Sequence, residues 1–283
     1  MNKKANIYKK PYLIAEIGIN HNGSIKIAKK MIELASQYNF NAVKFQKRDP
    51  EVCVPESEKQ KLRDTPWGTM TYLKYKKKIE LNIKQLTVLK KYAKKLKLDF
   101  CASCFDFNSL KLVNKINTFN KVPSAMLTNL DFLKSVAKMK KKTFISTGMS
   151  TINDITRAVN IFKKMKCNYN LMHCVSLYPC PEEKLNLRMI QTLKRRFKCE
   201  VGYSGHEPSV SPTIYAYMLG ASVIERHITL DRSMWGTDQA ASLSPEGMRM
   251  LTSVLLKSNK IFGNGVKNYG AEEKAMLKKF KYW

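Results

Sequence analysis

The sequence lacks an apolar run long enough to cross a membrane and lacks the pattern of a secretory signal. A membrane-spanning helix needs roughly 18 or more consecutive apolar residues, and no such run occurs. The basic segment Met1–Lys10 is not followed by an unbroken apolar stretch with a small-residue cleavage site. The seven cysteines are odd in number and scattered through apolar segments, which is typical of reduced, buried thiols. We therefore expect a cytoplasmic protein with no membrane-spanning segment.

Acidic residues are scarce: 22 Asp and Glu face 51 Lys and Arg, giving a formal net charge of +29. Such a charge is found in nucleic-acid-binding proteins, but no zinc finger, helix-turn-helix or aromatic–basic recognition motif accompanies it. In Lys90–Lys97 and Lys138–Lys142 the lysines interleave with apolar residues, as on an exposed helix face. We do not expect nucleic acid to be a partner, although a positive field helps to attract an anionic substrate.

The chain alternates short apolar segments with longer amphipathic ones, which predicts a repeated strand–helix unit. The predicted strands are Tyr12–Ile19, Ala42–Gln46, Asp99–Ser103, Thr118–Pro123, Thr143–Ser146, Tyr169–Cys174, Glu200–Ser204 and Val223–His227. The predicted helices are Ser24–Tyr38, Asn82–Lys97, Phe107–Ile116, Asn129–Lys140, Ile152–Lys166, Leu187–Phe197, Val210–Leu219 and Pro245–Phe262. Units repeated in this way over about 250 residues predict an α/β fold of the (β/α)₈ TIM-barrel class, and we expect a single domain over residues 1–283.

The alternative is an open, doubly wound sheet that binds a dinucleotide. That fold requires a glycine-rich turn after its first strand. The segment Gly18–Gly23 has only two glycines and lacks the GxGxxG spacing, so the barrel is the better prediction.

Polar residues occur where the predicted strands end, which is where barrel enzymes carry their active sites. They are Glu16, Lys44, Gln46, Ser103, Lys121, Ser146, His173, Ser176, Tyr178, Ser204, His206 and His227. A lysine inside a short apolar strand is costly unless it is paired or faces a ligand. A local salt bridge explains either Lys44 or Lys121 alone, but two such lysines at one barrel mouth, with several hydroxyls, indicate a phosphate or carboxylate site.

His206 and His227 end adjacent predicted strands, which lie roughly 5 Å apart, so both imidazoles can reach one divalent cation. Two imidazoles with open positions suit Mn²⁺, Fe²⁺ or Zn²⁺ acting as a Lewis acid. Asp238 follows as an acid–base group or a ligand of a substrate hydroxyl. His21 either orients substrate or caps the next helix, and both interpretations stay open. The Cys101-x-x-Cys104 pair has no second partner pair, so we interpret Cys101 as a buried thiol.

Several motifs in order along the chain resemble those of the sialic acid synthase family. They are Ala15–Gly23, Val43–Gln46, Ser146–Met149, His173-Cys174 with Tyr178-Pro179, Tyr203–His206, Ile224–His227 and Gly236–Asp238 with Ser242-Leu243. Each motif is short, but together they run from about Ile14 to Met250, and their shared order makes the resemblance specific.

The resemblance implies an enzyme that condenses phosphoenolpyruvate with an (N-acetyl)aminosugar or related aldose. The product would be a 2-keto-3-deoxy-nonulosonate plus phosphate. It implies phosphoenolpyruvate contacts at Lys44, Ser103, Lys121, Ser124, Ser146, Ser176 and Ser204, and acceptor contacts at Glu16, Gln46, Tyr178 and Asp238, with Asn20 as a further substrate contact. It implies Mn²⁺ or Mg²⁺ on His206 and His227, and catalytic roles for Glu16, Lys121, His206, His227 and Asp238. It also implies a homodimer.

Three features depart from the family pattern. Met126 stands where relatives carry an acidic residue in Lys-Ile-Gly-Ser-Gly-Glu/Asp, so Glu16, Asp238 or metal-bound water takes that role, or the acceptor differs. Positions 176 and 205 are serine and glycine where many relatives have asparagine and aspartate. The chain ends at Trp283, so we expect no C-terminal antifreeze-like domain.

Two other functions stay open at this stage. One is a synthase of a shorter, octulosonate-type 3-deoxy-ulosonate, since Lys121–Met126 is also similar to the proline-containing strand of those relatives. The other is a non-catalytic barrel that binds sugar or nucleic acid.

Overall fold

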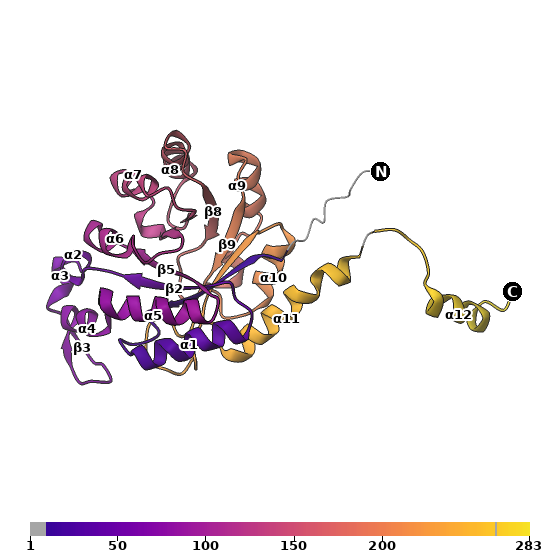
Figure 1. The fold of residues 1–283 in the computed structure, drawn as a ribbon, viewed down its shortest axis with the longest axis horizontal. Coiled ribbons are helices and arrows are strands. Elements are labelled where there is room, and N and C mark those ends of the chain that lie inside the picture. The colour runs from indigo at the N-terminus through magenta and orange to yellow at the C-terminus, as the bar shows by residue number, and fades with distance from the viewer. Residues whose placement is uncertain (1–9, 264) are drawn as a thin grey trace.

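A barrel of parallel strands surrounded by helices forms the body of the computed structural model, which describes residues 10–263 and 265–283 (Figure 1). The predictions made for residues 1–9 of the basic N-terminal segment lie outside the described residues. The barrel strands are β1 (Tyr12–Gly18), β2 (Ala42–Lys47), β5 (Asp99–Cys104), β6 (Asn120–Val122), β7 (Thr143–Ser146), β8 (Tyr169–Cys174), β9 (Val201–Gly205) and β10 (Val223–His227). The TIM-barrel prediction is confirmed, and each predicted strand is present.

The strands pair in the order β5-β2-β1-β10-β9-β8-β7-β6, and every pair is parallel. The first and last members of this order approach each other where the Thr118 backbone N–H, just before β6, donates to Phe100 O of β5 at 2.8 Å. The sheet therefore curves back on itself, so all the strand carboxyl ends surround one opening.

Helices follow the strands and cover the outside of the barrel. They are α1 (Ile25–Gln37), α5 (Ile83–Lys95), α6 (Phe107–Val113), α7 (Leu130–Lys138), α8 (Ile152–Lys164), α9 (Met189–Phe197), α10 (Ser211–Met218) and α11 (Pro245–Phe262). Side-chain caps explain several of their starts: Ser24 accepts from the Ile27 N–H, and Thr151 forms a capping box with Asp154. The eight predicted helices are all present, with ends shifted by a few residues.

Several segments contain structure that the sequence pattern did not predict. An insertion between β2 and α5 folds into α2 (Pro50–Cys53), α3 (Glu56–Lys59), β3 (Leu62–Arg63), β4 (Met70–Thr71) and α4 (Tyr72–Ile79). Near the end of the chain, α12 (Ala271–Phe280) lies apart from the barrel beyond an extended segment (Figure 1). Two short 3₁₀ turns, η1 (Ser124–Met126) and η2 (Glu182–Lys184), follow β6 and β8. In the described part of the chain, no helix combines the length and apolarity that a membrane crossing requires.

The barrel interior is apolar at one end and charged at the other. Side chains of a strand alternate between its two faces, and the lower interior layer consists of Ile14, Ala42, Cys101, Phe119, Phe144, Met172 and Val223. Two residues further along the same strands lie Glu16, Lys44, Ser103, Lys121, Ser146, Cys174 and Glu225, all buried. The strand period therefore places the polar groups above an apolar floor, at the carboxyl ends of the strands.

Candidate active site

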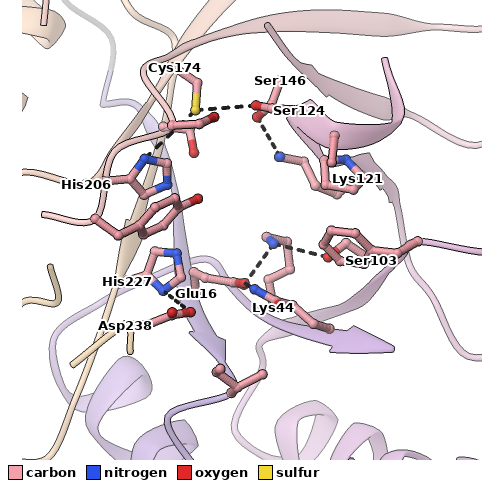
Figure 2. A pocket seen from close by; sticks show the side chains of 18 of the residues that line it. Glu16, Lys44, Ser103, Lys121, Ser124, Ser146, Cys174, His206, His227 and Asp238 are labelled. Carbon is pink, nitrogen blue, oxygen red and sulfur yellow. Dashed lines mark hydrogen bonds and ion pairs between the residues drawn. The ribbon is translucent and has the colours of Figure 1, made fainter. Parts of the chain in front are cut away.

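A cavity of about 330 Å³ opens at the carboxyl ends of the barrel strands. Its lining includes nearly every residue that the sequence singled out: Glu16, Lys44, Gln46, Ser103, Lys121, Ser124, Ser146, Ser176, Tyr178, Ser204, His206, His227 and Asp238. Figure 2 shows the two lysines on one side of this cavity and the two histidines on the other. The predicted residues thus come together in space, and the roles assigned to them remain predictions.

Four buried ionisable groups form a cluster at the base of the cavity. Lys44 Nζ lies 2.9 Å from Glu16 Oε2 and 3.6 Å from Glu225 Oε1, and Lys121 Nζ lies 3.6 Å from the same Glu225 oxygen. Burial by itself lowers the pKa of Lys44, but the facing carboxylates of Glu16 and Glu225 raise it above its usual value. Burial likewise opposes ionisation of Glu225, yet Lys121 and Lys44 hold the pKa of Glu225 below its usual range. Lys44 and Glu225 are therefore both charged at neutral pH.

Glu225 received no role from the sequence, although it lies between both lysines. A usable signal was present: Glu225 is two residues before His227 on the same strand, and residues two apart face the same side of a sheet. Once His227 was assigned to the barrel mouth, this alternation assigned Glu225 to it as well. Glu225 also accepts a hydrogen bond from Ser204 Oγ at 3.2 Å.

Hydroxyl groups surround the two lysines. Lys121 donates to Ser146 Oγ at 2.7 Å, and Lys44 to Ser103 Oγ at 3.4 Å. Ser124 and Ser176 approach each other over Gly148, where an added Cβ would lie 2.8 Å and 2.4 Å from their hydroxyl oxygens. Glycine at position 148 is thus required for this close approach. Ammonium groups flanked by hydroxyl donors suit the carboxylate and phosphate of a small anionic substrate.

The two histidines lie next to each other on the wall of the cavity opposite the two lysines (Figure 2). Their ring centroids are 5.4 Å apart, and the Tyr178 ring lies 4.0 Å from that of His206. His206 Nδ1 lies 2.8 Å from the carbonyl oxygen of Val175. Donation from Nδ1 to this carbonyl fixes the tautomer and leaves the Nε2 lone pair free to bind a cation.

The residues present fit a divalent metal held by two imidazoles. His227 Nδ1 is buried without a hydrogen-bond partner and lies 3.8 Å from Asp238 Oδ2. Burial lowers the pKa of His227 to about 3, so its ring is in the neutral form that binds metals. Within residues 10–263 and 265–283, no group of three or more His, Cys, Asp or Glu side chains is arranged around one point. The remaining ligands would therefore come from water or substrate.

A buried ion pair behind the histidines links the ends of β9 and β10. Arg226, next to His227, lies 2.8 Å from Glu207 Oε1, and both side chains are fully buried. Arg226 also donates to Ser209 O at 3.0 Å, and Glu207 accepts from Tyr203 Oη at 2.7 Å. The carboxylate of Glu207 folds back over Gly205: an added Cβ there would lie 2.6 Å from Glu207 Oε2. The glycine at position 205 thus leaves the space that this carboxylate occupies.

Asn20 does not line the cavity, although it was predicted to contact substrate. Its side chain is buried and donates to Ile228 O at 2.9 Å and to Ser242 Oγ at 2.8 Å. These bonds tie the end of β1 to the segment that follows β10. Asn20 therefore holds the segment after β10 in place and does not contact the cavity. Asp238, which lines the cavity, belongs to that segment.

His21 is likewise outside the cavity lining, and its Nδ1 accepts from the Gly23 backbone N–H at 3.0 Å. Of the two interpretations left open, local support of the turn before α1 fits this contact. Burial lowers the pKa of His21 to about 4, below its ordinary value near 6.5.

This shift predicts a pH dependence of stability. Below about pH 6.5 the unfolded chain binds a proton that the folded chain excludes, so the free energy of unfolding falls as the pH decreases towards 4. The full effect is about 3 kcal/mol, from ~1.4 kcal/mol per pKa unit. Urea unfolding at about pH 7 and about pH 5 should show a smaller loss in His21→Gln than in the unchanged protein. Equal losses in the two proteins would contradict the assignment.

The cavity lining also includes residues to which the sequence analysis assigned no role. They are Ile19, Arg48, Lys76, Phe105, Pro123, Ala125, Met149, Cys174, Glu225 and Thr237. Met126 is not among them, since it packs against the apolar core. The carboxylates that line the cavity are therefore Glu16, Glu225 and Asp238.

Comparison with known proteins identifies the family. The NeuB family model matches residues 31–267. The chain belongs to the NeuB family. It is 38% identical over 272 residues to the N,N'-diacetyllegionaminic acid synthase of Campylobacter jejuni, covering 94% of this chain and 81% of the relative. It is 39% identical over 249 residues to the N-acetylneuraminate-9-phosphate synthase of Drosophila melanogaster, covering 86% of this chain and 67% of the relative.

A solved structure of the family is also similar. The sialic acid synthetase of Leptospira borgpetersenii, crystallised with citrate, superposes with a TM-score of 0.83 at 30% identity, covering 97% of this chain and 92% of that one. The resemblance to the sialic acid synthases is thus confirmed for this NeuB-family chain. A truncated 3-deoxy-D-arabino-heptulosonate 7-phosphate synthase of Thermotoga maritima has a TM-score of 0.68 at 12% identity, with 90% of each chain covered, which supports the barrel fold alone.

Proposed function

We propose that this NeuB-family enzyme condenses phosphoenolpyruvate with a six-carbon aldose, giving a nine-carbon 2-keto-3-deoxy sugar acid and phosphate. The observation that carries the proposal is the single cavity in which a lysine pair faces a histidine pair. The names of the relatives favour a nine-carbon product over the shorter ulosonate and the non-catalytic barrel. Phosphoenolpyruvate supplies three of the nine carbons, so the acceptor has six.

In the proposed reaction, carbon 3 of phosphoenolpyruvate forms a bond to the aldehyde carbon of the sugar. The aldehyde oxygen takes up a proton and becomes a hydroxyl group, while positive charge develops at the carbon that bears the phosphate. Water adds to that carbon and loses one proton to give a hydroxyl group. The bond from this carbon to the phosphate oxygen then breaks, the hydroxyl loses its proton to the departing phosphate, and the water oxygen becomes the keto oxygen. The products are the keto acid and inorganic phosphate, so one water is consumed for each turnover.

The chain's own residues hold the reactants in position. Lys44 and Lys121, with the serine hydroxyls around them, bind the carboxylate and phosphate of phosphoenolpyruvate. Holding two reactants in contact removes much of the entropic barrier to their reaction. A divalent cation on His206 and His227, with Mn²⁺ or Mg²⁺ as our expectation, would polarise the aldehyde carbonyl. Gln46, Tyr178 and Asp238 also line the cavity and are proposed to contact the acceptor.

We propose that Glu16 and Glu225 supply the negative charge that the methionine at position 126 does not. Both carboxylates contact Lys44 at the base of the cavity, next to the proposed phosphoenolpyruvate site. Fixed charges aimed at developing charge stabilise a transition state without further reorganisation. We also expect a homodimer in the cytoplasm, with small molecules as the substrates.

The test is acceptor-dependent release of phosphate from phosphoenolpyruvate in the presence of Mn²⁺. We expect release with six-carbon N-acetylated aldoses and a nine-carbon product by mass spectrometry. No release with any aldose of five to seven carbons, whether free, N-acetylated or phosphorylated at its last carbon, would overturn the proposal. An eight-carbon product from a five-carbon aldose, with none from six-carbon sugars, would favour the shorter ulosonate instead.

Replacing Lys44 tests the proposed phosphoenolpyruvate site. Lys44→Ala should raise KM for phosphoenolpyruvate by about ten- to a hundredfold, because a hydrogen bond to a charged group contributes about 1.5–3 kcal/mol. The matched control is Lys47→Ala on the same strand, because Lys47 is also buried and paired, with Glu80 at 2.9 Å, but does not line the cavity. If Lys47→Ala raises this KM as much as Lys44→Ala does, the role assigned to Lys44 is wrong.

A further inference from the structure

A second chamber of about 280 Å³ adjoins the active-site cavity on the side of the β2–α5 insertion. Ile19, Arg48, Lys76 and Phe105 line both spaces. One wall of the chamber comes from the barrel rim and the other from α2 and α4 of the insertion. A ligand that reacts above Lys44 can therefore extend into this chamber past Arg48 and Lys76.

Arg48 continues a row of polar side chains that begins deep in the barrel. Lys44, Gln46 and Arg48 occupy alternate positions, and all three line the cavity. Alternate residues of an extended chain face the same side and are roughly 6–7 Å apart. Lys44 thus faces the proposed phosphoenolpyruvate site, Gln46 the middle of the cavity and Arg48 its outer end.

The structure holds the Arg48 guanidinium in a defined position. It stacks on the Phe105 ring at 3.8 Å from the ring centroid, which covers one face of the guanidinium plane. The Arg48 backbone N–H donates to Glu80 Oε1 at 2.9 Å. A stacked guanidinium keeps its edge available for two parallel hydrogen bonds, the geometry with which arginine binds phosphate.

Arg48 and Lys76 are not neutralised by neighbouring carboxylates. Glu80, which also lines the second chamber, forms its ion pair with Lys47 at 2.9 Å. Lys76 lies over the rings of Tyr72 and Tyr75, 5.1 Å and 5.4 Å from their centroids. Across the described part of the chain, no carboxylate forms an ion pair with Arg48 or Lys76 within 4.0 Å. At the base of the cavity, in contrast, Glu16 and Glu225 offset the charges of Lys44 and Lys121.

Arg48 and Lys76 therefore place two cations without an ion-pair partner in the described residues where the cavity meets the second chamber. We propose that Arg48 and Lys76 form an anion subsite for a phosphate group on the acceptor, at the end distant from its aldehyde. A phosphate carries close to two negative charges at neutral pH, which matches the two cations. This inference rests on the proposed function. The proposed reaction places the aldehyde end of the acceptor near Lys44 and the histidines, so the opposite end of the acceptor lies at Arg48 and Lys76.

The proposal selects an acceptor class that the comparisons leave open. The relatives at 38% and 39% identity include an N,N'-diacetyllegionaminic acid synthase and an N-acetylneuraminate-9-phosphate synthase. Carbons 1 to 3 of a nine-carbon product come from phosphoenolpyruvate, so carbon 9 is carbon 6 of the acceptor. A phosphate at the outer end of the site corresponds to a hexosamine 6-phosphate.

The experiment compares N-acetylmannosamine with N-acetylmannosamine 6-phosphate as acceptors at saturating phosphoenolpyruvate. We expect kcat/KM to be at least tenfold higher for the 6-phosphate in the unchanged protein. Arg48→Ala and Lys76→Ala should each lower this preference by about tenfold or more, as expected for loss of a charged hydrogen bond. The matched control is Lys74→Ala, which removes the same charge from an exposed position of α4 and should leave the preference unchanged.

The outcomes separate the two phosphates that could occupy the subsite. If Arg48→Ala raises KM for phosphoenolpyruvate tenfold and leaves the acceptor preference unchanged, the pair binds the phosphate of phosphoenolpyruvate and the proposal is overturned. Turnover of both acceptors at equal kcat/KM overturns the subsite but leaves the proposed function intact.

Calorimetric titration with N-acetylmannosamine 6-phosphate tests the subsite without turnover. Binding at least tenfold weaker to Arg48→Ala than to Lys74→Ala would support the subsite, whether or not the acceptors react. A lack of turnover with both acceptors would count against the proposed function alone. Equal binding to the two variants would overturn the subsite.

Discussion

Replacing His227 with alanine is expected to abolish specific Mn²⁺ binding and to lower kcat by on the order of 10³-fold, since Lewis-acid stabilisation contributes several kcal/mol. The expectation follows from geometry: two imidazoles 5.4 Å apart form one wall of the cavity, and His227 Nδ1 is buried without a hydrogen-bond partner. Removing one ring leaves a single imidazole, which cannot retain a divalent cation against water. Free Mn²⁺ measured by electron paramagnetic resonance gives a readout that does not depend on turnover.

His173→Ala is the matched control for this prediction. His173 is also a buried imidazole at the end of a barrel strand, on β8, and its Nε2 lies 2.7 Å from the carbonyl oxygen of Leu185. It does not line the active-site cavity. His173→Ala should therefore retain Mn²⁺ binding while losing some stability. Full Mn²⁺ binding by His227→Ala would refute the assigned metal site.

Replacing Arg226 with methionine is expected to lower the free energy of unfolding by about 3–5 kcal/mol, the usual cost of removing one partner from a buried ion pair. The carboxylate of Glu207 would remain buried without its cation, because both side chains are fully inaccessible to solvent. The guanidinium also donates to the backbone of the segment after β9, so its loss should loosen the junction between the two histidine-bearing strands. Denaturant unfolding measures the stability change, and Mn²⁺ titration measures the effect on the histidine pair.

The double variant Arg226→Met/Glu207→Met distinguishes two causes of lost stability. One is the loss of the ion pair, and the other is the burial of an unpaired carboxylate. Replacing both partners removes the isolated carboxylate, so the double variant should be more stable than Arg226→Met alone. Tyr203 Oη, which donates to Glu207, loses its acceptor in the double variant, so recovery should be partial. A double variant less stable than either single variant would contradict this account.

The active-site residues could be predicted where an unusual side chain stands within, or at the end of, a single predicted strand. Lys44 and Lys121 stand out because an ammonium group in a short apolar strand has no local explanation. His206 and His227 stand out because they end consecutive strands. These signals depend on alternation along a strand and on the order of strands, both of which are visible in the sequence.

The residues that sequence analysis missed take their position from contacts between distant segments. Glu225 matters because it lies between lysines that precede it by more than a hundred residues. Arg48 lines the site because Phe105, from another strand end, supports it. The insertion that contributes Lys76 folds into helices of four to eight residues, too short for an apolar period to be recognised.

The sequence by itself determined the barrel, the order of its strands and helices, and the family, since strand and helix periods and short motifs are local properties of the chain. Only the tertiary structure decided which charges are paired and which are not. Glu16 and Glu225 pair with the lysines at the base, whereas Arg48 and Lys76 form no ion pair within 4.0 Å with a carboxylate of the described residues. Pairing depends on distances of a few ångströms between side chains from separate strands, because Coulomb energy and desolvation both change steeply over that range. No pattern along one segment encodes those distances.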